Sequence, residues 1–128
     1  MKSATAAVLL VILSGCSANR LPDIPLEPYS LSEVQREAVK KAVSNRFKDP
    51  NSAQFESFVA MNQGGKVHVC GRVNAKNSFG GYGGFVPFWV DVGADTNYAV
   101  LMNSAVDGNE FAYSVVRGQC SSLGLIVL

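Results

Sequence analysis

The chain has few charged residues and almost no net charge. Its 128 residues include 11 Lys plus Arg against 10 Asp plus Glu, and 16% of the residues are charged. This balance excludes a strongly basic nucleic-acid binder, because such domains concentrate positive charge on one face. A disordered chain is excluded as well, because 48% of the residues are hydrophobic and disordered chains are poorer in them. The composition is that of one ordinary globular domain.

The chain also lacks an N-terminal apolar run long enough to cross a membrane. After Lys2, the apolar segment covers residues 4–13, which is about half the length that a transmembrane helix needs. A basic start, a short apolar segment and the small residues Ser14 and Gly15 are typical of an export signal. We therefore predict a signal peptide over residues 1–15.

Cys16 directly follows the small residues, and Leu13-Ser14-Gly15-Cys16 resembles the lipobox of bacterial lipoproteins. The resemblance implies cleavage before Cys16, a diacylglyceryl group on its thiol and an acyl chain such as palmitate on the new amino terminus. In lipoproteins of enterobacterial type, an Asp after the Cys retains the protein in the inner membrane. Ser17 stands there instead, which favours the outer membrane on its periplasmic side, with the inner membrane as the alternative. The competing interpretation is a plain signal peptide that ends at a chance cysteine.

The segment after the signal peptide is rich in proline. Loss of residues 1–15 removes Lys2, so the mature chain has 11 − 1 = 10 basic residues against 10 acidic ones. Residues 16–29 contain three prolines spaced three residues apart, Pro22, Pro25 and Pro28. This spacing favours an extended tether. The single globular domain is then expected over residues 30–128.

An amphipathic helix is predicted over residues 30–47. One face collects residues at helical spacing, namely Leu31, Val34, Gln35, Ala38, Val39, Ala42, Val43 and Phe47. Ser30 and Glu33 have the spacing of a capping box, which places the start of the helix.

The remainder of the chain has mainly the pattern of strands. Four segments are rich in apolar residues and bounded by turn residues, at 53–61, 66–75, 87–92 and 98–106. Residues 109–119 have helical spacing, with a strand as the alternative. We therefore predict an α+β fold, in which the N-terminal helix packs on a small antiparallel sheet of about four strands and a second helix lies near the C-terminus.

Two cysteines remain in the folded part once Cys16 carries lipid. An even number of cysteines in an exported protein predicts a disulfide between Cys70 and Cys120. Alternation along the strand places His68 and Cys70 on the face opposite the valines, so both faces of the sheet are expected to be covered.

His68 and Cys70 also suggest a metal site or a Cys-His nucleophile. A zinc site needs about four ligands, but the chain has one His and no paired Cys-x-x-Cys spacing. A nucleophilic Cys needs a free thiolate, which a disulfide removes. We therefore interpret His68 as an ordinary strand residue and predict neither a metal nor another cofactor.

The most unusual segment of the mature chain is residues 78–86. Phe79, Tyr82 and Phe85 alternate with four glycines, at Gly80, Gly81, Gly83 and Gly84. Aromatic side chains on a glycine-rich backbone offer a large contact area at low entropic cost. The three aromatic residues therefore form a candidate partner-binding surface. The alternative is that they cap the core beneath a tight turn.

Two motifs resemble a family of small exported proteins and lipoproteins of proteobacteria. They are Lys48-Asp49-Pro50-Asn51-Ser52-Ala53-Gln54-Phe55 and Cys70-Gly71-Arg72-Val73-Asn74-Ala75-Lys76-Asn77, the second followed by Gly80-Gly81-Tyr82. The resemblance brings no catalytic residues. It implies that Asn74, Lys76 and Asn77 form a polar strand end that shapes the glycine-rich segment through side-chain to backbone hydrogen bonds.

These observations predict a non-enzymatic protein. The chain lacks a Gly-x-Ser-x-Gly elbow and a His-Glu-x-x-His motif, which argues against a small hydrolase, although Asp91 and Asp95 have a spacing open to a glycosidase pair. We expect a lipid-anchored binding or accessory module, with an inhibitor of a periplasmic or host enzyme as the alternative. Its expected partners are the membrane, through the N-terminal lipid, and an envelope protein. No nucleic acid is expected.

Overall fold

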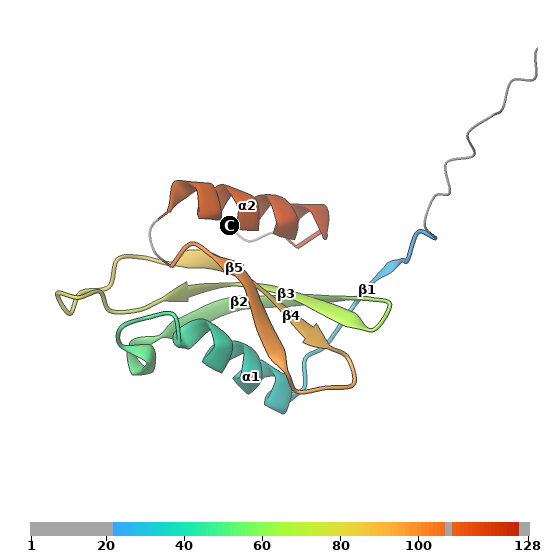
Figure 1. Cartoon of the computed structure of the whole chain (residues 1–128), viewed down its shortest axis with the longest axis horizontal. Helices are drawn as coiled ribbons and strands as arrows, with labels where there is room; N and C mark the ends of the chain where they lie inside the picture. The colour runs from blue at the N-terminus through green and yellow to red at the C-terminus, as the bar shows by residue number, and fades with distance from the viewer. Residues whose placement is uncertain (1–21, 107–108, 126–128) are drawn as a thin grey trace, which may run out of the picture.

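The fold is an antiparallel sheet with one helix on each face. The structure is a computed structural model, and it describes residues 22–106 and 109–125. In chain order the described elements are β1 (Leu26–Pro28), α1 (Glu33–Ser44), a 3-10 turn (Pro50–Ser52), β2 (Gln54–Gln63), β3 (Lys66–Asn74), β4 (Val86–Gly93), β5 (Ala99–Ser104) and α2 (Glu110–Ser122). Figure 1 shows α1 below the sheet and α2 above it. The predicted α+β class is confirmed.

The described sheet has five strands, not about four. Its order is β1-β2-β3-β4-β5, and every neighbouring pair is antiparallel. The additional strand is β1, in which Leu26 pairs with Gln63 and Pro28 with Met61. Proline has no backbone N–H to donate to a neighbouring strand. It is tolerated in an edge strand because such a strand has a neighbour on one side only. The folded domain therefore begins inside the range 16–29, which the proline spacing assigned to a tether.

The start of α1 differs from the sequence prediction. The N-cap is Ser32, whose Oγ accepts a hydrogen bond from the Gln35 amide at 3.2 Å, and Gln35 Oε1 accepts one from the Ser32 amide at 3.0 Å. The predicted capping box of Ser30 and Glu33 is therefore wrong by two residues. Ser32 rather than Ser30 begins the helix because of Gln35. The side-chain amide of Gln35 also donates, at 3.3 Å, to the carbonyls of Gly93, Ala94 and Thr96 at the end of β4 and in the turn that follows.

The main core lies between α1 and the sheet. Val39 and Val43 of α1 are fully buried against the inward-facing apolar residues of β3 and β4, which are Val67, Val69, Val73, Phe88, Val90 and Val92. Gly71 makes room for Phe88, since a Cβ at position 71 would lie 2.5 Å from Phe88 Cζ. Val34 was expected on this face but is exposed, because successive helical residues are ~100° apart and its neighbour Gln35 points inward.

The second face of the sheet is covered by α2. Cys70 of β3 and Cys120 of α2 form the predicted disulfide, with an S–S distance of 2.02 Å. Both cysteines are fully buried, together with Val116 and Leu125. The side chain of Asn109 caps the helix by accepting from the amides of Phe111 and Ala112. The segment 109–119 is therefore helical, and its strand alternative is wrong.

Candidate functional site

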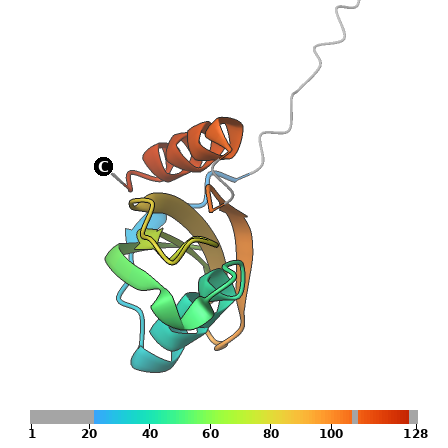
Figure 2. The ribbon, with the colours of Figure 1, turned by 90° about the vertical axis from the view of Figure 1, so that its left-hand side faces the viewer.

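The glycine-rich segment forms the β3–β4 loop, residues 75–85, at one end of the sheet. Figure 1 shows this loop extending past the strands, and Figure 2 views the molecule from that end. Asn77 organises its tip: Asn77 Oδ1 accepts hydrogen bonds from the amides of Phe79 at 2.9 Å and Gly81 at 3.1 Å. The Asn77 amide donates to the Gly81 carbonyl at 2.8 Å, and the Gly80 amide donates to the Asn77 carbonyl at 3.0 Å. Four hydrogen bonds around one residue thus fix the backbone that carries Phe79.

The middle of the loop is attached to the 3-10 turn. The Lys76 amide donates to Ser52 Oγ at 2.9 Å, and the Tyr82 hydroxyl donates to the Ser52 carbonyl at 3.0 Å. Lys76 and Tyr82 also face each other in an isolated antiparallel bridge. Ser52 therefore attaches both sides of the loop, at Lys76 and at Tyr82, to the 3-10 turn.

The base of the loop is fixed by Asn74, the last residue of β3. Its side chain is buried, and Asn74 Oδ1 accepts from the Gly84 amide at 3.1 Å. Gly84 has a φ of 112°, a conformation that favours glycine. Asn74 and Asn77 thus shape the loop through their side chains, as the family resemblance implied, whereas Lys76 does so through its backbone amide.

The three aromatic residues of the loop differ in exposure. Phe79 is 97% exposed at the tip, and Tyr82 is 43% exposed with its hydroxyl bonded to Ser52. Phe85 is half-buried, and the Arg72 guanidinium carbon lies 5.4 Å from the centre of its ring. Phe79 does not cap the core, because almost its whole surface faces solvent. Tyr82 and Phe85 instead help to hold the loop on the domain.

Sequence reasoning missed two residues that contact the loop. Ser52 bonds residues 76 and 82, and Lys48 Nζ donates to Ser78 Oγ at 2.7 Å. Both come from the connection between α1 and β2, 24 to 30 positions away in the chain. Both stand in the first of the two family-like motifs, and the two motifs lie side by side in the fold. The presence of both motifs in one sequence was the signal that could have pointed to Lys48 and Ser52.

His68 lies in β3, two residues before Cys70. It is buried, and its Nδ1 is 2.6 Å from Asp91 Oδ1, which also accepts from Trp89 Nε1 at 2.9 Å. Both polar side chains thus satisfy each other next to the disulfide cluster, which is the arrangement expected of buried polar residues. Both contacts are made to Oδ1 of Asp91, and Asp95 lies exposed in the β4–β5 turn.

Over 22–106 and 109–125, no group of three or more His, Cys, Asp and Glu side chains is placed to hold a metal ion. Within the same ranges, no helix has the length and apolar character that membrane crossing requires. Cys16 and the predicted signal peptide lie outside the described residues.

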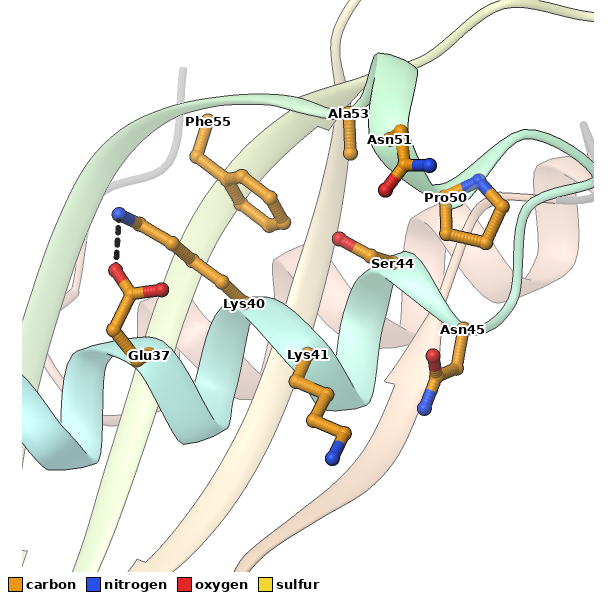
Figure 3. Close-up of a pocket in the computed structure, with 9 residues that line it drawn as sticks. All are labelled: Glu37, Lys40, Lys41, Ser44, Asn45, Pro50, Asn51, Ala53 and Phe55. Carbon is orange, nitrogen blue, oxygen red and sulfur yellow. Dashed lines mark hydrogen bonds and ion pairs between the residues drawn. The ribbon is translucent and has the colours of Figure 1, made fainter.

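A groove of about 490 Å³ opens between α1 and the start of β2. Lys40 runs along it beside Phe55, and its Nζ pairs with Glu37 at 2.8 Å. Figure 3 shows Lys41 and Asn45 pointing away from Phe55. Binding sites for small molecules bring a few polar groups together at one point. This groove does not, so the β3–β4 loop remains the candidate site.

The comparisons with known proteins give no match. No protein-family model, no curated protein and no solved structure matches the sequence.

Proposed function

We propose that this protein is a lipid-anchored envelope protein that acts as a non-enzymatic binding or accessory module, with the β3–β4 loop as its contact surface. The observation that carries the proposal is the presentation of Phe79, which is 97% exposed on a backbone fixed by Asn77. An aromatic side chain is a frequent centre of binding energy in protein interfaces. A backbone that is already ordered loses less entropy on binding.

The position of the loop relative to the N-terminus supports a partner away from the anchoring membrane. The chain enters the fold at β1, where Leu26 pairs with Gln63 beside the β2–β3 turn. The loop follows the opposite end of β3, nine residues away, which is about 30 Å at the usual rise of a strand. A lipid on Cys16 would therefore attach at one end of the sheet, and Phe79 would be presented at the other.

The proposal is tested by purifying the full lipidated chain from detergent-solubilised envelopes and quantifying the proteins that accompany it. The wild type is compared with Phe79→Ala and with Phe111→Ala, a matched control because Phe111 is 76% exposed on α2. We expect at least one protein to be lost with Phe79→Ala and kept with Phe111→Ala. The same set of proteins with all three chains would contradict the proposal.

A further inference from the structure

Two lysines from distant parts of the chain lie beside the loop that presents Phe79. Lys48 precedes the 3-10 turn, Lys76 is the second residue of the β3–β4 loop, and both line a hollow of about 180 Å³ at the foot of the loop. Asn77 and Ser78 line the same hollow. The fold therefore creates a positively charged rim next to an apolar tip, which the formally near-neutral composition does not reveal.

Neither lysine is neutralised within the described part of the chain. The ion pairs found there join Lys40 to Glu37, His68 to Asp91 and Arg72 to Glu56. Lys48 donates to the uncharged hydroxyl of Ser78, which leaves its charge uncompensated. Asp49 is next to Lys48 in the sequence but does not line the hollow. Arg46 also lines the hollow and has an interaction of its own, so the inference rests on Lys48 and Lys76 alone.

We infer that the partner is a protein surface that has an apolar socket for Phe79 and acidic residues at the rim of that socket, facing Lys48 and Lys76. The inference rests on the proposed function and adds the chemistry of the partner. Burial of an aromatic side chain supplies most of the affinity in such an interface. Complementary charge at the rim steers association and excludes partners with a basic surface.

A protein partner fits the geometry better than the bilayer that holds the lipid. Ile24 lies against the β2–β3 turn. Its carbonyl accepts from Gln63 Nε2 at 3.2 Å, and its side chain would lie 3.2 Å from a Cβ added at Gly64. The first described residues therefore lie at the end of the sheet opposite the β3–β4 loop, so a lipid on Cys16 would attach at that end. Insertion of the loop into the same membrane would require the domain to turn over on its tether.

The test uses peptides selected from a random displayed library on the immobilised full mature chain in detergent. We expect the recovered peptides to combine apolar residues with Asp or Glu. For a synthetic peptide of a recovered sequence, replacement of its Glu and Asp by Gln and Asn should weaken binding about fivefold, because two rim charge pairs contribute ~1 kcal/mol in total. The double variant Lys48→Glu with Lys76→Glu should weaken binding by a larger factor, because two attractions become repulsions, and should favour a version of the peptide with Lys at the acidic positions.

A matched control variant separates the effect of the rim lysines from the effect of net charge. Lys41→Glu with Lys66→Glu makes the same change in net charge at two exposed lysines away from the hollow, and should leave binding unchanged. If selected peptides need Phe79 but show no acidic preference and no effect of the rim variant, the inference fails and the proposed function stands. If Phe79→Ala binds the peptides as the wild type does, the proposed function fails.

The bilayer alternative is decided separately. A fluorophore on Phe79→Cys is measured in the full chain reconstituted in vesicles of phosphatidylethanolamine and phosphatidylglycerol with brominated acyl chains. Our account predicts no quenching, because the loop points away from the anchoring membrane. Strong quenching would overturn the inference and assign the loop to lipid.

Discussion

The side chain of Asn77 holds the backbone of Phe79. Asn77 Oδ1 accepts a hydrogen bond from the Phe79 amide at 2.9 Å, and a second bond from Gly81 at 3.1 Å closes the turn around the same oxygen. Phe79 is the most exposed large apolar side chain of the described residues, at 97%. One polar side chain thus orders the segment that displays the most accessible aromatic ring.

Replacement of Asn77 by Ala should loosen the loop with little effect on the rest of the domain. Two hydrogen bonds at an exposed site are lost, which lowers the free energy of unfolding by about 1 kcal/mol. Amide hydrogen exchange should show reduced protection at Phe79 and Gly81, while β3 and β4 keep theirs. Asn77→Asp retains an acceptor oxygen and serves as the control. Unchanged protection in Asn77→Ala would show that the glycine-rich backbone is ordered by other contacts.

Phe79→Ala and Phe88→Ala should differ strongly in stability. Phe79 makes no core contact, so its removal should change the free energy of unfolding by less than about 0.5 kcal/mol. Phe88 is fully buried, with its ring 5.9 Å from that of Phe55 and 5.7 Å from that of Phe58. Its removal should cost about 3–5 kcal/mol. Denaturant unfolding of both variants gives the comparison, and a large loss for Phe79→Ala would mean that the loop is part of the core.

Helix α1 and the four longer strands, β2 to β5, were predictable because each has a repeating pattern of apolar residues. β1 was not, because three residues with a proline carry no such pattern and the pairing of Leu26 with Gln63 depends on a partner far along the chain. The start of α1 was misplaced for a related reason. Ser30 and Ser32 both begin plausible capping boxes, and the bonds of Gln35 to the β4–β5 turn select the second one.

The candidate site was predictable in part. Composition drew attention to Phe79, Tyr82 and Phe85 together, but it could not separate the exposed ring from the two that rest on the domain. That separation depends on Ser52, which bonds Tyr82 from 30 positions away. The charged rim was missed because Lys48 and Lys76 form no cluster in the sequence and meet only in the fold.

Loss of the disulfide should destabilise the domain and release α2 first. Cys70 and Cys120 are 50 residues apart, and closing a loop of that size is worth ~4 kcal/mol in the chain-entropy model. The double variant Cys70→Ala with Cys120→Ala should therefore melt more than about 10 °C below the wild type. Hydrogen exchange in α2 should increase more than in α1, because the cluster beneath α2 is the smaller of the two. An unchanged melting temperature would contradict this account.

Cys16 should be the lipidated N-terminus of the mature protein. Mass spectrometry of membrane-extracted protein should find an acylated peptide that begins at Cys16. Cys16→Ser should either leave the signal peptide uncut or release the domain from the membrane. A soluble, unmodified chain that begins after Cys16 would contradict the lipobox interpretation.

Photo-crosslinking in intact cells tests the central claim most directly. A benzoylphenylalanine is placed at position 79, or at position 111 as an equally aromatic and exposed control on α2. If the loop that Asn77 orders is the contact surface, position 79 should give a discrete adduct with one envelope protein, and position 111 should not. That protein, once purified, should bind the wild type about 30-fold or more tightly than Phe79→Ala, the loss expected of a central aromatic residue. No adduct at position 79, or equal binding of the folded Phe79→Ala chain, would contradict the account.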